Sequence, residues 1–115
     1  MRRVSKPWGH ELIFAETDRY AGKILHLEAG QCLSLQYHER KDEWLMVTSG
    51  TVDLEIGPLD GALARHRLES GDTVHIAPQT RHRLTAIEDT DIFEVSTPEA
   101  EDVVRLEDRY GRAGQ

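Results

Sequence analysis

Four polar residues have side chains and a spacing that suit a metal ion: Gln36, His38, Glu43 and His82. Gln36 and His38 are two positions apart, so on a β-strand both side chains point from the same face, about 6–7 Å apart. Glu43 begins the next apolar run, and the polar residues 39–42 before it predict a turn that folds Glu43 back toward His38. His82 begins a later strand pattern. Imidazole nitrogen together with carboxylate and amide oxygen binds divalent cations, so we expect these donors to hold one metal ion where their strands meet.

Each of these residues also has an ordinary structural interpretation. Gln36 alone would be a polar residue on a solvated strand face, and Glu43 would be a surface charge at the start of a strand. A single histidine on a strand is more often hydrogen-bonded than metal-bound, so the joint spacing is what favours a site. The remaining histidines show no such spacing, and we expect them to be structural: His10, His26, His66 and His75.

The elements that must position these donors are short β-strands. Apolar and polar residues alternate with a period of two in several segments: 24–28, 32–36, 51–56, 74–76 and 82–86. Glycine, proline and acidic residues separate these segments, and the middle of the chain has no sustained helical pattern. Short strands joined by short turns are typical of an antiparallel sandwich or barrel. We therefore expect an all-β fold, in which residues 99–106 form either a short helical turn or an extended arm.

The length and composition bound the architecture. A chain of 115 residues suits one domain, and we expect a single domain over residues 1–115, with an N-terminal arm at 1–9 and a C-terminal arm at 99–115. No apolar run approaches the ~20 residues that a membrane span requires. The basic residues at the start of the chain are not followed by the apolar stretch of a signal peptide.

Cysteine usage and charge limit the compartment and the partners. The single cysteine, Cys32, has no partner for an internal disulfide and lies in an apolar stretch, so we expect a buried thiol in a reducing compartment. These features predict a cytoplasmic protein. The formal net charge is −7, and most basic residues are interleaved with acidic ones. Nucleic acids and anionic membranes are therefore not expected partners, whereas a small molecule is.

The donor spacing resembles the two sequence motifs of the cupin superfamily. Residues 30–50 fit the first motif, G-x5-H-x-H-x4-E-x6-G, with Gln36 in the place of its first histidine. Residues 71–82 follow the second motif, G-x5-P-x-G-x2-H, more loosely, because Ala77 replaces the proline and Gln79 replaces the glycine. The resemblance implies a double-stranded β-helix, a jelly-roll barrel with the metal inside it.

A narrower resemblance runs from about residue 6 to residue 112. The Gln-x-His pair, the stretch Lys-Pro-Trp-Gly at 6–9 and the ending Leu-Glu-Asp-Arg-Tyr-Gly-Arg at 106–112 are similar to the C-terminal domain of bifunctional mannose-6-phosphate isomerase/mannose-1-phosphate guanylyltransferase enzymes. This resemblance implies that Arg112 is a functional arginine. Those domains usually carry several histidines after the glutamine, where this chain has His-Glu-Arg at 38–40. No Gly-rich phosphate loop is present, so we do not expect guanylyl transfer.

Three hypotheses about function remain open. The resemblance favours a metal-dependent enzyme that interconverts an aldose and a ketose, acting on a sugar or sugar phosphate, with Arg112 as the first candidate for the phosphate contact. Arg83 and Arg81 come behind it, and we expect both to lie on a solvated strand face, because each is one residue away from His82 in a pattern of period two. Two histidines and one carboxylate are also the ligands of non-haem iron oxygenases, and a non-catalytic sugar-binding cupin is the third hypothesis. Zinc is the first expectation for the metal, with manganese, iron and nickel as alternatives. The general base is not identified, and the sequence offers Lys41, Asp42, His26 and His75. Small cupins often pair, so we also expect a homodimer.

Overall fold

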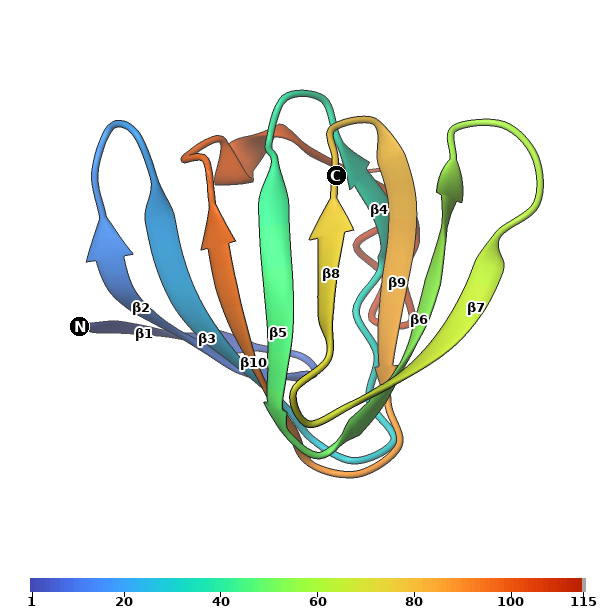
Figure 1. Ribbon diagram of the computed structural model, residues 1–115. Helices are drawn as coiled ribbons and strands as arrows, with labels where there is room; N and C mark the ends of the chain where they lie inside the picture. The colour runs from blue at the N-terminus through green and yellow to red at the C-terminus, as the bar shows by residue number, and fades with distance from the viewer. Residues whose placement is uncertain (115) are drawn as a thin grey trace.

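The computed structural model describes residues 1–114 and contains two β-sheets that face each other (Figure 1). The elements in chain order are β1 (Arg2–Lys6), β2 (Gly9–Glu16), β3 (Ala21–Leu27), β4 (Leu35–His38), β5 (Glu43–Ser49), β6 (Thr51–Pro58), β7 (Ala64–Glu69), β8 (Thr73–Ile76), β9 (Thr80–Ala86), β10 (Thr90–Ser96), the 3-10 turn η1 (Ala100–Asp102) and β11 (Val103–Glu107). The first sheet has the order β1-β2-β3-β10-β5-β8 and the second β11-β4-β9-β6-β7. All named strand pairs are antiparallel, so the prediction of an all-β fold is confirmed.

The core fills the space between the two sheets. The alternating pattern predicted for residues 51–56 appears in β6, where Val52 and Leu54 are buried and the polar residues between them face outward. Burial of every second side chain is what allows a strand with one polar face to lie at the surface of a sandwich. The buried apolar cluster consists of Trp8, Leu25, Leu27, Leu45, Val47, Val52, Leu54, Ile76, Leu84, Ala86 and Ile92.

Both ends of the chain are joined to the sandwich by strand pairing. β1 pairs with β2 at the edge of the first sheet, and β11 pairs with β4 at the edge of the second. The segment 99–106 contains both structures that the sequence left open, since the short turn η1 leads directly into β11. Trp8 is part of the core and Tyr110 packs against it, while the Tyr110 hydroxyl donates a hydrogen bond to Gln31 Oε1. The structured ends therefore contribute to the walls of the sandwich.

Two turns depend on a left-handed backbone. Gly50, between β5 and β6, has φ +90°, and a Cβ there would lie 2.3 Å from the Asp89 carbonyl oxygen, so only glycine fits. Gln79, between β8 and β9, has φ 60° although it is not glycine, and its amide donates to the His38 carbonyl oxygen at 2.7 Å. This is the position where the second cupin motif has glycine.

Among residues 1–114, no helix is long and apolar enough to cross a membrane.

Candidate functional site

The four predicted metal donors line one cavity of about 280 Å³ between the sheets. Gln36 and His38 lie on β4, Glu43 is the first residue of β5, and His82 lies on β9 directly opposite Gln36. The strand spacing expected from the sequence therefore does bring Gln36 and His38 to the same inner face. His38, Glu43 and His82 are each about 5% exposed or less, so this end of the cavity is shielded from water.

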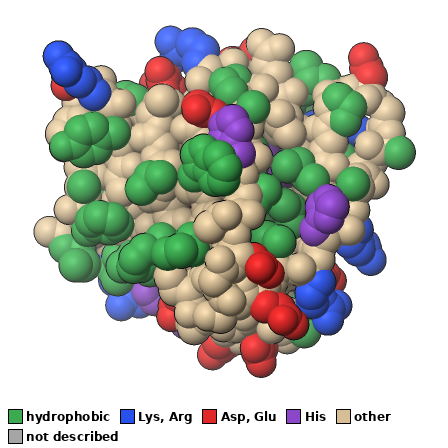
Figure 2. Space-filling view, in the orientation of Figure 1, with side chains coloured by type: hydrophobic (Ala, Val, Ile, Leu, Met, Phe, Trp, Pro, Cys, Tyr) green, Lys and Arg blue, Asp and Glu red, His purple; other side chains and the backbone are tan. Residues whose placement is uncertain are grey.

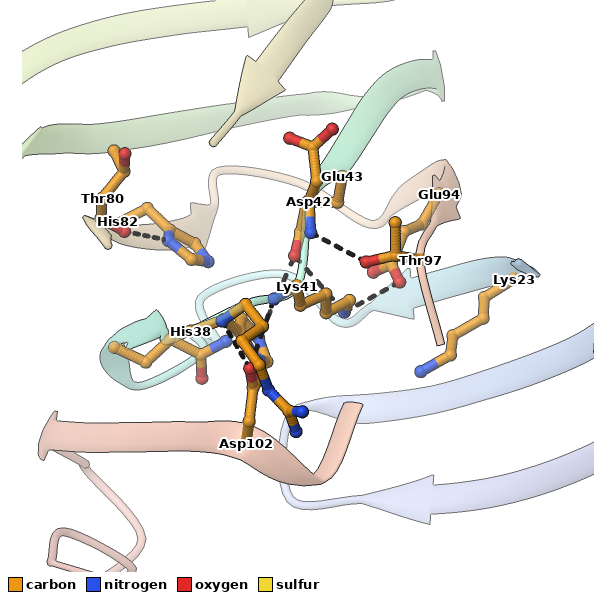
Figure 3. Close-up of polar contacts among 12 residues, drawn as sticks. Lys23, His38, Lys41, Asp42, Glu43, Thr80, His82, Glu94, Thr97 and Asp102 are labelled. Atoms are coloured by element: carbon orange, nitrogen blue, oxygen red, sulfur yellow. Dashed lines mark hydrogen bonds and ion pairs between the residues drawn. The ribbon is translucent and has the colours of Figure 1, made fainter. Parts of the chain in front are cut away.

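The His38 imidazole is held by a carboxylate behind it. Its Nδ1 lies 2.6 Å from Asp102 Oδ1, and Asp102 also accepts backbone hydrogen bonds from Arg40 and Lys41 (Figure 3). His38 and these backbone amides hold the pKa of Asp102 below its ordinary value, against the effect of burial. An ionised carboxylate only accepts hydrogen bonds, so the His38 proton sits on Nδ1 and the Nε2 lone pair faces Glu43, whose Oε2 is 4.0 Å away. This is how proteins orient histidine ligands.

His82 has the same arrangement with a backbone partner. Its Nδ1 donates to the Thr80 carbonyl oxygen at 3.0 Å, which leaves Nε2 as an acceptor. Burial lowers the pKa of His82 to about 4, and burial also lowers the pKa of His38. The two rings stack with centroids 6.3 Å apart. At neutral pH both imidazoles are therefore uncharged, which is the form that binds metal.

A chain of buried charges runs beside the histidines. The Lys41 ammonium lies 3.3 Å from Glu43 Oε2 and 3.0 Å from Glu94 Oε2, and Figure 3 shows its side chain extended toward Glu94. Lys23, 3.8 Å from Glu11, lies farther along the same cavity. Burial and the neighbouring Glu94 raise the pKa of Glu43 to about 7, whereas Lys41 and Lys23 hold the pKa of Glu94 below its ordinary value. The two carboxylates outweigh burial and raise the pKa of Lys41, which stays protonated.

The donor types fit a divalent cation, but their spacing does not form a coordination sphere. Two neutral imidazoles with exposed Nε2 lone pairs, a carboxylate and an amide oxygen are a suitable set for zinc, manganese, iron or nickel. Within residues 1–114, however, no three His, Cys, Asp or Glu side chains are grouped closely enough to hold an ion. Glu43 instead contacts the Lys41 ammonium, and Gln36 Oε1 accepts a hydrogen bond from Ser34 at 2.6 Å. The metal site therefore stays a prediction.

The structure separates the residues proposed as general bases. Lys41 lines the cavity. Asp42 and His75 contact each other at 2.6 Å on the exposed side of the sheet, and His26 pairs with Asp91 at 2.7 Å, also away from the cavity. Those three side chains therefore cannot contact a substrate bound in the cavity beside the metal donors.

The predicted arginines also divide into two groups. Arg112 lines the cavity and its guanidinium is fixed by Asp108, with Nε and Nη2 each 3.0 Å from a carboxylate oxygen. Arg81 donates instead to the carbonyl oxygens of Pro58 and Gly61, and Arg83 pairs with Glu55 and Glu107. Arg81 and Arg83 therefore have partners outside the cavity, which leaves Arg112 as the arginine of the three that can meet a ligand there.

Several cavity residues were not identified from the sequence, namely Glu11, Lys23, Glu94 and Arg105. A signal existed for two of them. Lys23 continues the alternation of Leu25 and Leu27 along β3, and Glu94 continues that of Ile92 along β10, so each is a charged residue at an inward position. Charged side chains are rarely buried without partners. A charge at an inward position of a strand therefore indicates a site.

Solved structures define the class of fold. KdgF from Halomonas sp. superposes with a TM-score of 0.76 at 23% identity, covering 89% of this chain and 92% of that one. A Klebsiella pneumoniae protein described as having a double-stranded β-helix domain gives a TM-score of 0.68 at 18% identity, covering 90% of this chain and 83% of the other. The chain therefore has the predicted double-stranded β-helix fold.

The sequence comparisons then identify the family. The family model "Mannose-6-phosphate isomerase C-terminal" matches residues 1–108, and this chain belongs to that family. Mannose-1-phosphate guanylyltransferase from Escherichia coli K12 is 34% identical over 116 residues, covering 96% of this chain and 23% of the relative. The xanthan biosynthesis protein XanB from Xanthomonas campestris pv. campestris strain B100 is 31% identical, covering 96% and 24%. The chain thus spans about a quarter of the length of these relatives.

Proposed function

We propose that this protein is a metal-dependent isomerase of the mannose-6-phosphate isomerase type, acting on a sugar or sugar phosphate by aldose–ketose isomerisation. The observation that carries the proposal is the cavity, which combines the two uncharged histidines with a buried, protonated lysine and a buried, ionised carboxylate. Its volume of about 280 Å³ lies near the lower end of the roughly 300–1,000 Å³ typical of small-molecule sites, which suits one monosaccharide. Membership of the family supports the choice of substrate class.

His38, His82, Glu43 and Gln36 are the residues that would hold the cation. When bound, a divalent metal would supply positive charge next to the sugar oxygens that become negative during the reaction. Among this chain's own groups, Asp102 and the Thr80 carbonyl keep the two imidazoles oriented, as found for His38 and His82 above. The low exposure of this end of the cavity excludes water from the reacting carbons.

The proton transfer is assigned to Glu94. Aldose–ketose isomerisation moves one proton from C2 to C1 of the sugar and one from the C2 hydroxyl to the carbonyl oxygen at C1, so no external oxidant or reductant is needed. Glu94 is ionised at neutral pH because Lys41 lies against it, and it lines the same cavity as the donors. Lys41 stays protonated and is a poor base, so we place it as the cation that neutralises charge on Glu94 and on the substrate.

The test is interconversion of mannose 6-phosphate and fructose 6-phosphate by the purified chain, with zinc, manganese, iron(II) and nickel added in turn. We expect turnover with at least one metal, and a loss of roughly 100- to 10,000-fold in kcat for Glu94→Gln. The matched control is Glu101→Gln, on the surface turn η1, which should retain wild-type turnover. Absence of interconversion under every metal would remove the isomerase proposal.

The same preparation separates the other hypotheses. Oxygen consumption that depends on added iron(II) would support an oxygenase. Saturable binding of mannose or mannose 6-phosphate without turnover would support a sugar-binding cupin, in which Lys41 and the donors only orient the ligand.

A further inference from the structure

Three of the four predicted metal donors lie on one sheet, and the fourth lies on the other. Gln36, His38 and His82 belong to strands of the second sheet, whereas Glu43 begins β5 in the first. Strand pairing fixes each donor only within its own sheet. Facing sheets pack about 10 Å apart, while a bound cation needs its ligands within about 0.2 Å of their ideal distances. The separation between the sheets at this end of the cavity therefore has to be fixed by other contacts.

Two connections cross between the sheets at this end of the molecule and run beside each other (Figure 1). Residues 39–42 lead from β4 to β5, and residues 97–102 lead from β10 to β11. The Asp42 amide donates to Thr97 Oγ1 and the Thr97 amide donates to the Asp42 carbonyl oxygen, each at 3.0 Å (Figure 3). The first connection is therefore anchored at the residue that precedes Glu43.

Asp102 anchors the other end of the same connection. Its carboxylate accepts hydrogen bonds from the Arg40 amide at 2.7 Å and the Lys41 amide at 3.2 Å, and its Oδ1 lies 2.6 Å from His38 Nδ1. The Asp102 side chain is only 8% exposed, so water competes little for these hydrogen bonds. One carboxylate thus holds both a donor imidazole and the backbone that leads to the opposite sheet.

We propose that Thr97 and Asp102 are positioning residues of the metal site, which hold the two sheets at the separation that lets Glu43 join the histidines around one cation. The inference rests on the metal site of the proposed function. A connection that is ordered before the cation arrives lowers the conformational cost of binding, so both residues raise metal affinity without contacting the metal. Asp102 also orients His38, whereas among residues 1–114 the Thr97 hydroxyl forms a hydrogen bond only with the Asp42 amide.

The test measures the zinc dissociation constant by calorimetry on the full chain and on two variants. Asp102→Asn should weaken zinc binding by roughly 10- to 100-fold, and Thr97→Val, which keeps the side-chain shape, by roughly 3- to 10-fold. Thr97→Ser keeps the hydroxyl and should bind zinc as the wild type does. The matched controls are Glu101→Gln on η1 and Thr73→Val, an exposed threonine on β8, and neither should change the constant. A circular-dichroism melt verifies that each variant folds.

A double-mutant cycle separates positioning from a general loss of stability. Because Thr97 acts through Glu43, Thr97→Val should weaken zinc binding in the wild type but cause no further weakening in Glu43→Gln, which lacks the carboxylate. A residue that only stabilised the fold would lower the melting temperature and leave the zinc constants unchanged. Equal weakening by Thr97→Val in both backgrounds, or wild-type zinc affinity in either Asp102→Asn or Thr97→Val, overturns the inference.

The outcomes also separate this inference from the isomerase proposal. If the zinc constants change as expected in a chain without isomerase activity, the positioning role stands and the isomerase proposal fails. If the wild type isomerises its substrate while both variants keep wild-type zinc affinity, the positioning role is overturned and the function stands. Where zinc does not bind, the divalent metal that does bind replaces it in every titration. A wild-type chain that binds none of zinc, manganese, iron(II) and nickel overturns both.

Discussion

His38 and His82 illustrate what individual residues contribute to this site. Each is uncharged, and each is oriented through Nδ1 by an acceptor behind it, so both present Nε2 lone pairs inside the cavity. Removal of either ring takes away a nitrogen donor that no neighbouring residue replaces.

We predict that His38→Ala or His82→Ala abolishes tight binding of a divalent metal. The measurement is zinc titration by calorimetry together with elemental analysis of the dialysed protein. His66→Ala, an exposed histidine on β7, is the control and should bind metal as the wild type does. Stoichiometric metal in the His38→Ala/His82→Ala double variant would contradict the metal-site prediction.

Lys41 has a structural role that a second substitution tests. Its ammonium compensates two buried carboxylates, Glu43 and Glu94, and it is as buried as they are. We predict that Lys41→Met lowers the free energy of unfolding of the metal-free protein by roughly 3–5 kcal/mol, because the buried carboxylates then lose the cation that compensates them. Urea unfolding followed by tryptophan fluorescence measures this. Lys6→Met, which removes a lysine without an ion pair in the described chain, should change stability by less than about 0.5 kcal/mol. A Lys41→Met protein as stable as the wild type would show that the network is not needed for folding.

At the scale of elements, the turn between β8 and β9 is the clearest departure from the family pattern. Gln79 adopts φ 60°, a conformation that costs an L-residue roughly 1–2 kcal/mol and glycine almost nothing. The left-handed backbone at Gln79 therefore falls at the position where the second cupin motif has glycine. The turn leads into β9, which carries His82 to the cavity and the Thr80 carbonyl that orients its ring, so the geometry of the turn matters to the site.

We predict that Gln79→Gly stabilises the protein by roughly 0.5–1 kcal/mol. Glycine relieves the strain of the left-handed backbone, and its greater conformational freedom in the unfolded chain offsets part of this gain. Thermal unfolding measures the difference. Gln79→Ala keeps the Cβ and should give no comparable gain. The opposite test is Gly50→Ala, which should destabilise the turn between β5 and β6 because its Cβ meets the Asp89 carbonyl. A lower melting temperature for Gln79→Gly would mean that the glutamine side chain outweighs its backbone cost.

At the scale of the whole molecule, the outer face of the six-stranded sheet is unusually apolar. Its exposed side chains include Phe14, Trp44, Met46, Phe93 and Val95, and Figure 2 shows green side chains gathered over these strands. Exposed apolar patches of this kind are costly on a monomer in water and commonly lie at protein–protein interfaces. The homodimer expected from the sequence remains a prediction.

We predict that sedimentation equilibrium at tens of micromolar protein returns twice the monomer mass of 13.1 kDa. Burial of apolar side chains would provide the driving force for association. The same experiment in moderate salt should give the same mass, because apolar contacts are not screened by ions. A monomer mass across the concentration range would rule out the homodimer.

Much of the fold and part of the site could be predicted from local sequence. The alternation of apolar and polar residues predicted strands in segments that include parts of β3, β6 and β9. The spacing of the four donors predicted that they lie together, and all of them line one cavity: Gln36, His38, Glu43 and His82. Gln36 and His38 share a face because side-chain direction along a strand depends only on neighbouring positions. Glu43 and His82 lie on other strands, and the spacing of the cupin motifs is what grouped them with this pair. Binding of a metal ion by these four side chains stays a prediction.

Only the tertiary structure decided which face of each strand is inside. In β10 the large apolar residues Phe93 and Val95 point to solvent, while Glu94 points into the cavity. The alternation shows which residues share a face, but it does not show which face meets the opposite sheet, because that depends on pairing with strands distant in sequence. For the same reason the lysine-carboxylate network and Arg105 emerged only when β3, β5, β10 and β11 were brought around one cavity.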